Sequence, residues 1–153
     1  MVARLKLVLL AGLVLLAGAS SAAASEMATP AEAQEMSKKA MSAINHIGPD
    51  KAFALFSDEN GGFLVKDLYV FCMDKNGVML SHAKKPQLVG KNLIDFNKYG
   101  ELLFQDMIKV AATQGEGWVD YHWPYPESEE IKEKTSYITS HPSGFFCGVG
   151  AYK

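Results

Sequence analysis

The stretch "DLYVFCMDKNGVMLSHA", residues 67–83, decides the fold of this chain. It consists of an apolar run, a turn at residues 74–77 and a second, shorter apolar run, which is the pattern of a β-hairpin. The first run is apolar on both faces, which alternate as Leu68, Val70 and Cys72 against Tyr69, Phe71 and Met73. Such a strand belongs in the middle of a sheet that is covered on both sides.

Helical spacing precedes this hairpin. Thr29 is placed to cap a helix, Pro30 suits the first helical position, and Glu32 completes a capping box. Apolar residues then recur every three or four positions until Gly48 ends the helix. A short second helix follows, and the N-terminal helices together are predicted to occupy about residues 29–57.

After the hairpin the chain returns to helical spacing once and then to strands. Residues 97–115 place Leu103 and Met107 on one side of a predicted helix. Three strand segments complete the chain, over residues 118–125, 131–140 and 145–152. This order of elements predicts an α+β fold, with helices packed against a central antiparallel sheet of about five strands within residues 67–153.

The first residues have the pattern of a secretory signal. Arg4 and Lys6 precede an apolar run over residues 7–19, and small residues follow the run. We expect residues 1–24 to be a cleaved signal peptide, and residues 25–153 to be a single domain in the periplasm or outside the cell. An uncleaved membrane anchor is the alternative, although the run is shorter than the roughly 20 residues of a spanning helix.

Composition and motifs disfavour several classes of function. Removing Arg4 and Lys6 with the signal takes the net charge from −2 to −4, which gives no electrostatic reason to bind nucleic acid. The four histidines fall in different predicted elements without metal-ligand spacing. Neither a nucleophile elbow nor a phosphate-binding glycine pattern occurs. We therefore predict neither an enzyme nor a protein that holds a metal or cofactor.

The chain has two cysteines, Cys72 and Cys147, for which an oxidising compartment permits a disulfide. They are 75 positions apart and match no metal, haem or redox-motif spacing. Whether they pair or stay two buried thiols depends on which strands are neighbours. The sequence leaves both possibilities open.

The aromatic residues concentrate in "GEGWVDYHWPYP", residues 115–126. Strand alternation places Tyr121 and Trp123 on one face, and Trp118 and His122 on the other. Tyrosine and tryptophan each combine an apolar ring with a polar hydrogen that needs a partner when it is buried. This face therefore suits either a core or a pocket that is partly apolar and partly hydrogen-bonding.

The next strand, "EIKEKTSYITS", brings Lys134, Ser136 and Tyr137 into a hairpin with the aromatic strand. A lysine beside phenol and indole donors suits a small carboxylate, because the lysine supplies charge and the rings supply shape and direction. The alternative is that Tyr121 and Trp123 only pack the core while the lysine faces water, as strand lysines usually do.

Five marks occur in a familiar order: "DKNG" after a strand, "LVGKNL", "GWVDYHWP", "KTSY" and the terminal "GVGAY". Together, over about residues 67–152, they resemble the single Cache domain of the second type, an extracytoplasmic sensor module of bacterial chemoreceptors and histidine kinases. The resemblance implies a PAS-like fold with a central antiparallel sheet. A long N-terminal helix covers one face of that sheet, and a small-molecule pocket lies on the other.

The resemblance also implies a site and a role. The pocket side of the sheet would carry Tyr121, Trp123, Lys134, Tyr137, Phe71 and His82. Its ligand would be a small organic acid or a similar metabolite. Because no output module follows Lys153, we expect a free-standing sensor that signals through a separate membrane receptor or histidine kinase. The alternative is a protein-interaction module whose pocket is vestigial.

Overall fold

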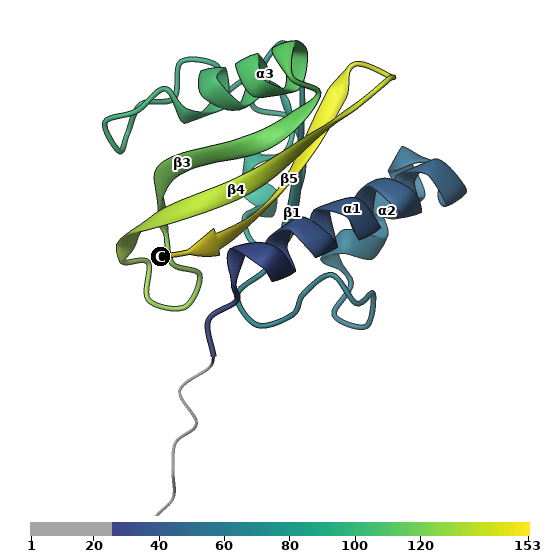
Figure 1. Cartoon of the computed structure of the whole chain (residues 1–153), viewed down its shortest axis with the longest axis horizontal. Coiled ribbons are helices and arrows are strands. Elements are labelled where there is room, and N and C mark those ends of the chain that lie inside the picture. The colour runs from purple at the N-terminus through teal and green to yellow at the C-terminus, as the bar shows by residue number, and fades with distance from the viewer. Residues whose placement is uncertain (1–25) are drawn as a thin grey trace, which may run out of the picture.

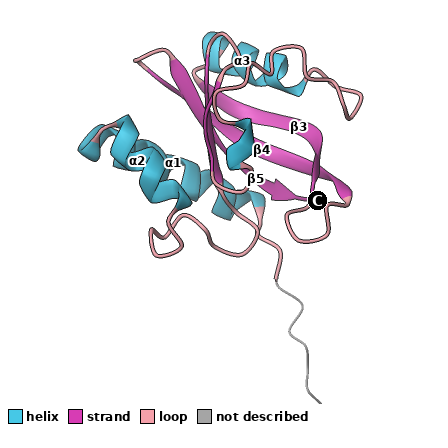
Figure 2. Ribbon diagram, turned by 180° about the vertical axis from the view of Figure 1, so that it is seen from behind, coloured by secondary structure: helices cyan, strands magenta, loops and turns pink. Residues whose placement is uncertain are grey.

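The computed structural model describes residues 26–153, so the predicted signal peptide lies outside the described residues. A single antiparallel sheet separates two helical layers (Figures 1 and 2). Helices α1 and α2 cover one face, and α3 covers the other. The predicted α+β fold with a five-stranded sheet is confirmed. Within residues 26–153, no helix has both the length and the apolar character needed to cross a membrane.

The N-terminal helices follow the predicted signals. Helix α1 spans Pro30–Ile47 and α2 spans Pro49–Ser57. The predicted capping box is formed: the Thr29 hydroxyl accepts the backbone N–H of Glu32, and the Glu32 carboxylate accepts the backbone N–H of Thr29. Gly48, at φ 82°, lets the chain turn from one helix into the next.

The strands are β1 (Val70–Asp74), β2 (Met79–His82), β3 (Glu116–Pro124), β4 (Ile131–His141) and β5 (Phe145–Tyr152). Their order across the sheet is β2-β1-β5-β4-β3, so the doubly apolar β1 lies inside the sheet, as its composition predicts. A short 3₁₀ helix, η1, covers Pro86–Leu88, and α3 covers Leu103–Thr113. Helix α3 starts later than its predicted segment, because Gly100 at φ 91° breaks the helical path.

The face under α1 is a closed apolar core. Ala33, Ala40 and Ile44 of α1 pack there on side chains of β1 and β5. Cys72 and Cys147 are register partners on β1 and β5, and a disulfide joins them. Both sulfur-bearing residues are buried. The packing of α1 on β1 and β5 joins the N-terminal helix to the middle of the sheet.

The face under α3 holds a second core that is rich in aromatic residues and includes Phe71, Tyr121, Trp123 and Tyr152. Leu103, Phe104 and Met107 of α3 close it from above. The segment between η1 and α3 adds further partly buried rings to this side. The candidate site lies within this second core.

Candidate functional site

Three side chains form a row across the α3 face of the sheet. Tyr121 of β3 is the register partner of Lys134 on β4, and Lys134 is the register partner of Tyr152 on β5. Direct partners in an antiparallel sheet point to the same side. A lysine is therefore held between two tyrosines in the interior of the protein.

The ammonium of Lys134 is fully buried. Its Nζ lies 4.0 Å from the centroid of the Tyr69 ring and 4.4 Å from that of Tyr152. Within the described part of the chain, Nζ has no hydrogen-bond acceptor. Burial lowers the pKa of Lys134 to about 7, and the negative charge of Asp67 acts in the opposite direction. The cation–π contacts offset part of the desolvation cost and leave the donor hydrogens unused.

The glycines of "GVGAY" make room for this arrangement. A Cβ at Gly150 would lie 2.4 Å from Cε of Lys134 and 2.2 Å from Oγ of Ser136. A Cβ at Gly148 would lie 2.4 Å from the tip of the Phe71 ring. Both glycines lie on the α3 face of β5, so the lysine and the phenyl ring pass directly over bare backbone. The terminal motif thus forms the floor of the site.

Trp123 is at the centre of the aromatic cluster. Its ring centroid is 5.8 Å from both Phe96 and Tyr99, 6.0 Å from Phe104 and 6.1 Å from His82. Phe96 and Tyr99 come from the segment before α3 and cover the indole. Trp123 Nε1 is buried and has no hydrogen-bond partner among residues 26–153. The indole acts on the nearby Tyr69 hydroxyl and opposes the rise that burial gives the pKa of Tyr69, but Nε1 makes no hydrogen bond of good geometry and is a second donor without an acceptor in place.

The other polar groups of the cluster are paired in defined ways. The Tyr121 hydroxyl is 2.8 Å from Oγ of Ser136. The Tyr152 hydroxyl donates to the carbonyl of Pro124 at 2.7 Å. Burial raises the pKa of Tyr121 and of Tyr152 above the usual tyrosine range, so both phenols stay protonated.

His82 is neutral in this environment. Burial, followed by the positive charges of Lys134 and Lys85, lowers the pKa of His82 to about 3. Its Nδ1 accepts the backbone N–H of Lys85 at 3.0 Å. Because a neutral imidazole carries one proton, that proton lies on Nε2. His82 is therefore a fixed hydrogen-bond donor and carries no charge.

A small cavity lies next to these groups. It is lined by Tyr69, Phe71, His82, Leu103, Phe104, Met107, Tyr121 and Trp123. Its free volume is about 10 Å³, close to the space that one water molecule needs. A larger guest requires the covering side chains to move. Within residues 26–153, no three histidine, cysteine, aspartate or glutamate residues gather to hold a metal ion.

Most of the predicted site residues meet on this face, but Tyr137 does not. Tyr121, Trp123, Phe71 and His82 line the cavity, and Lys134 lies beside it. The placement of Tyr137 beside Lys134 is wrong, because residues three apart on a regular strand point to opposite faces.

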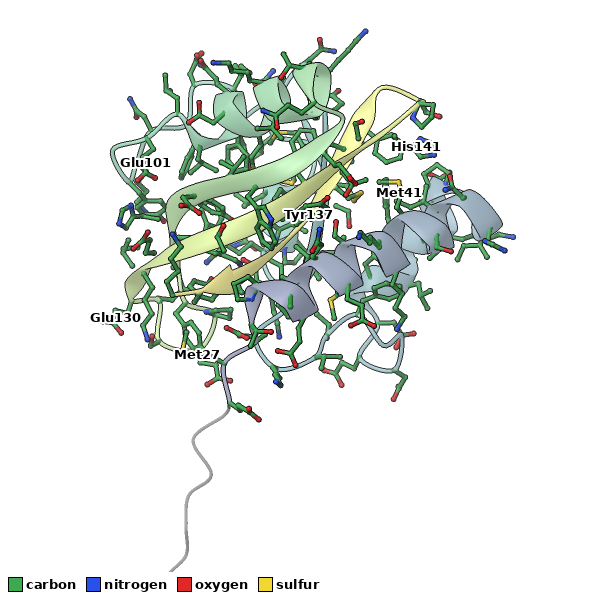
Figure 3. All side chains as sticks on the ribbon, in the orientation of Figure 1. Met27, Met41, Glu101, Glu130, Tyr137 and His141 are labelled. Carbon is green, nitrogen blue, oxygen red and sulfur yellow. A yellow bond between two sulfur atoms is a disulfide. The ribbon has the colours of Figure 1, made fainter. Side chains whose placement is uncertain are left out.

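The ring of Tyr137 packs on Trp118 at 5.0 Å. Its carbonyl accepts from the Ser37 hydroxyl of α1. Figure 3 shows Tyr137 on the side of the sheet where α1 lies. Tyr137 is therefore left out of the candidate site.

Sequence reasoning missed six aromatic or polar members of the cluster: Tyr69, Phe96, Tyr99, Phe104, Ser136 and Tyr152. Ser136 and Tyr152 had a usable signal, because strand alternation from Lys134 and from the two glycines places them on the same face. Phe96 and Tyr99 had none, since an irregular segment has no period from which to read a direction.

The site occupies a region that matches a known family. The family model of the Cache domain matches residues 60–153, which is more than half of the chain. This chain belongs to the Cache domain family. The match covers all five strands and α3, so it includes every element that contributes to the site.

Individual relatives agree with the Cache assignment. The methyl-accepting chemotaxis protein McpP of Pseudomonas putida is 34% identical over 88 residues, which is 56% of this chain and 16% of that protein. The chain therefore corresponds to a small part of that receptor's length.

Solved sensor domains extend the likeness to most of the described chain. A structure described as the periplasmic sensor domain of a chemotaxis protein is 29% identical, with a TM-score of 0.60, over 80% of this chain and 88% of that one. A Cache chemosensory domain described for carboxylic acid recognition is 25% identical, with a TM-score of 0.61, over 78% of this chain and 82% of that one.

A methyl-accepting chemotaxis protein from Vibrio parahaemolyticus shares the fold, with a TM-score of 0.70 and 22% identity, over 80% of this chain and 86% of that one. Cache domains of this kind are extracytoplasmic sensor modules. The assignment supports a role in ligand sensing and signalling.

Proposed function

We propose that this Cache domain binds a small carboxylate at Lys134 and Trp123. One observation carries the proposal: two buried donors from neighbouring strands, Lys134 Nζ and Trp123 Nε1, both lack an acceptor. A buried donor without a partner costs about 1–3 kcal/mol, and more when it is charged. Such a cost is explained if a ligand supplies the acceptor.

A carboxylate meets the chemistry of these donors. It carries two oxygens and a negative charge, so it offers acceptors to an ammonium and an indole N–H together. His82 Nε2–H is a third donor in the same cluster, and the rings of Phe71 and Phe104 offer apolar contact to a short carbon chain. The cavity must widen to admit any acid, and small acids require the least movement of the covering side chains.

The relatives support this assignment by analogy. One of the similar structures is described for carboxylic acid recognition by a Cache chemosensory domain. The predicted signal peptide at residues 1–24 would deliver the domain to the periplasm or beyond the cell. There it would pass its bound state to a separate membrane receptor or histidine kinase.

A second candidate function is a protein-interaction module with a vestigial pocket. The observation in its favour is the cavity itself, whose free volume of about 10 Å³ leaves no room for an organic acid without movement. Against it stands Lys134, since a pocket that has lost its ligand has no use for a buried ammonium without an acceptor.

The test is a thermal-shift screen of two- to four-carbon carboxylates, followed by calorimetric titration of those that stabilise the protein. Lys134→Met keeps an unbranched side chain as far as Cε and removes the ammonium group. Lys132→Met is its matched control, because Lys132 lies on the same strand and face but is half-buried beside Glu130 and Tyr125.

We expect Lys134→Met to weaken carboxylate binding at least about thirtyfold, and Lys132→Met to leave it unchanged. The protein must first be shown to contain no co-purified ligand. If no carboxylate then stabilises it, the result contradicts the proposal and favours the interaction module. Equal affinity in wild type and Lys134→Met would remove the lysine from the site.

A further inference from the structure

The two edge strands of the sheet differ in what lies beyond them. Beyond β2, the chain covers its own edge: the backbone N–H of Gly90 donates to the carbonyl of Met79 at 2.8 Å, and the N–H of Met79 donates to the carbonyl of Lys91 at 3.0 Å. At the opposite edge lies β3, and no strand among residues 26–153 pairs with its outer side. An uncovered edge exposes unpaired backbone groups with which a second chain can pair.

The register of β3 shows which of its backbone groups point outward. Just before the strand, the carbonyl of Gly115 accepts the N–H of Ser140 at the end of β4. Near the other end of β3, the N–H of His122 instead donates to the carboxylate of Glu101 at 2.9 Å, on the side away from β4. Because backbone groups alternate in direction along a strand, the odd-numbered residues of β3 pair with β4 and the even-numbered residues point outward.

Between these two hydrogen bonds, Trp118 and Asp120 turn their N–H groups outward, and neither N–H has an acceptor among residues 26–153. Helix α1 packs on β4 and β5 and leaves the side chains of Trp118 and Asp120 exposed. Trp118 is 40% exposed, and its ring centroid lies 5.0 Å from that of Tyr137. The indole therefore presents a flat apolar surface beside unpaired backbone groups.

The charged side chains around Trp118 are mainly acidic. Glu116 and Asp120 flank it on the same face of β3, and Glu133 of β4 lies on that face as well. Lys153 is shared between Asp120, at 2.9 Å, and Glu133, at 2.8 Å. Glu116 belongs to no ion pair among residues 26–153. Three acids with one lysine leave this surface with a net negative charge.

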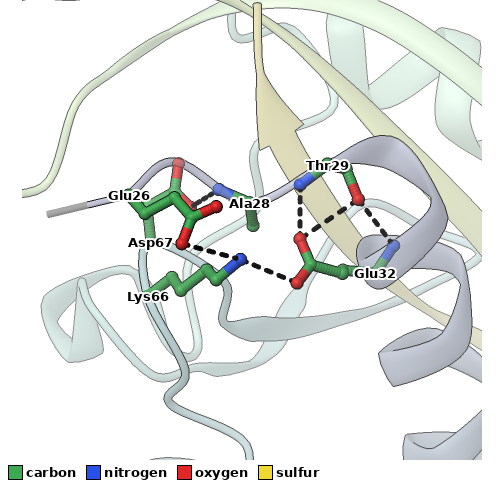
Figure 4. A network of polar contacts seen from close by, with 6 residues as sticks. All are labelled: Glu26, Ala28, Thr29, Glu32, Lys66 and Asp67. Carbon is green, nitrogen blue, oxygen red and sulfur yellow. Dashed lines mark hydrogen bonds and ion pairs between the residues drawn. The ribbon is translucent and has the colours of Figure 1, made fainter.

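The acidic residues at the start of α1 are engaged differently (Figure 4). There, Lys66 pairs with Glu32 at 2.7 Å and lies 4.0 Å from Glu26. Glu32 also accepts the N–H of Thr29. Those carboxylates serve contacts within the chain. Glu116 has no such contact in the described part of the chain, so its charge is left for a partner.

We propose that the outer edge of β3 binds an extended, basic segment of another protein. The segment adds an antiparallel strand, so that its backbone pairs with the outward groups of Trp118 and Asp120. Directly opposite residues of such a pair share one face, where opposite charges attract. The segment therefore carries lysine or arginine opposite Glu116 and Asp120, and an arginine opposite Trp118 stacks on the indole.

A second copy of this chain fits the edge poorly. Pairing two β3 strands antiparallel about Trp118 would set Glu116 of one copy opposite Asp120 of the other, and the two-fold symmetry would repeat this contact. Like charges directly opposite each other are destabilising. The charge pattern thus favours a basic partner over self-association.

The inference does not depend on carboxylate binding. The even-numbered side chains of β3 turn away from the α3 face, whereas Tyr121 and Trp123 turn toward it. The edge is therefore available to a partner whether or not an acid binds at Lys134. Failure of one proposal leaves the other standing.

The probe is a blocked seven-residue peptide, Thr-Lys-Thr-Arg-Thr-Lys-Thr, whose basic residues share one face when it is extended. The control peptide has glutamate in place of both lysines. Calorimetry at low ionic strength measures the affinity of each peptide for the full chain, and amide NMR locates the binding surface. We expect the basic peptide to bind at least about tenfold more tightly than the control and to shift the amide signals of Trp118 and Asp120 most.

N-methylated versions of the basic peptide test the backbone pairing. In an antiparallel pair, the lysine and arginine N–H groups point toward β3, because they lie opposite its outward-pointing residues. N-methylation of these three residues should abolish binding, while N-methylation of the two internal threonines should not. Binding that survives methylation of the basic residues would overturn the pairing.

The matched variants test the indole. Trp118→Ala should weaken binding of the basic peptide about tenfold. Ile47→Ala removes a similarly exposed apolar side chain at the end of α1 and should leave the affinity unchanged.

Equal binding of the basic and acidic peptides, or binding of neither, would overturn the inference. Equal affinity of wild type and Trp118→Ala for the basic peptide would do the same. A dimer seen by analytical ultracentrifugation that Trp118→Ala dissociates would also overturn it, because the edge would then belong to a second copy.

Discussion

The two faces of the sheet differ in how their buried polar groups are satisfied. Under α1, the Ser37 hydroxyl lies 3.4 Å from the carbonyl of Tyr137 and 3.2 Å from the hydroxyl of Thr139, and a disulfide ties β1 to β5. Under α3, Lys134 and Trp123 keep buried donors without acceptors. One face holds the fold together, and the other keeps buried donors that the proposed ligand would satisfy.

Strand β4 shows the contrast within a single element. Its odd-numbered residues Thr135 and Tyr137 belong to the α1 side, whereas Lys134 and Ser136 belong to the α3 side. Because side chains alternate along a strand, substitutions at two neighbouring positions of β4 affect opposite faces of the sheet. One of these faces is the core under α1, and the other is the candidate site under α3.

The largest effect is expected on the structural face. Removing the disulfide with Cys72→Ala/Cys147→Ala should lower the free energy of unfolding by about 2–5 kcal/mol, because it frees a long loop in the unfolded chain. Urea unfolding measures the loss. Carboxylate affinity, measured where the variant is still folded, should not change. A loss of binding by folded variant protein would show that the two faces are not independent.

The next effect is expected at the floor of the site. In Gly150→Ala, the new methyl group would overlap the paths of Lys134 and Ser136, so both side chains must shift. We expect carboxylate affinity to fall about tenfold or more, measured by calorimetry.

Gly144→Ala is the control for Gly150→Ala. It strains the β4–β5 turn at φ 88°, where a Cβ would meet nothing within 4 Å. It should lower stability without lowering affinity. Equal carboxylate affinities in wild type, Gly150→Ala and Gly144→Ala would mean that Gly150 does not position Lys134.

The stability of the free protein should depend on pH through Lys134. Its pKa is about 7 when folded and 10.5 in the ordinary state, so the unfolded chain binds more protons between these values. Stability should therefore rise as pH increases from about 7 toward 10. Below pH 7 the cost of the buried charge is fully present.

Lys134→Met isolates this effect. The variant should be more stable than wild type at pH 6, and the difference should shrink as pH rises from 7 to 10. Chemical unfolding at several pH values measures it. A difference that stays constant over this range would mean that the ammonium is not desolvated as the structure indicates.

The smallest effect is expected for Tyr121→Phe. It removes the hydrogen bond to Ser136 and keeps the ring, so stability should fall by about 0.5–1.5 kcal/mol. Thermal unfolding measures the change. Ser136→Ala should cost a similar amount, and the double variant should cost less than the sum because both remove the same bond. A fully additive double variant would contradict that pairing.

Much of the fold was predictable because its signals are local. The capping box at Thr29 and Glu32, the turn at residues 74–77 and the strand alternation all act within a few residues of sequence. Periodicity could not fix the start of α3, where the positive φ of Gly100 decides.

The site was only partly predictable, because it depends on register. Alternation places Tyr121 and Trp123 on one face, and the family resemblance implies that this face is the pocket side. The resemblance also implies Tyr137 there, but the period of two puts Tyr137 on the opposite face from Lys134. The position of Gly150 beneath the lysine could not be found from the sequence alone, because it arises from a close approach to Lys134, which lies on another strand.

The most direct test of the account is the titration of the Lys134 ammonium by NMR, with ¹³Cε-labelled lysine and Lys134→Met to assign the signal. We predict that Lys134 titrates near pH 7 in the free protein. When the protein is saturated with lactate or propionate, whichever binds more tightly, its pKa should rise well above that value. A free-state titration near the ordinary lysine pKa, or a pKa that the bound acid leaves unchanged, would contradict the assignment of the α3 face as a carboxylate site.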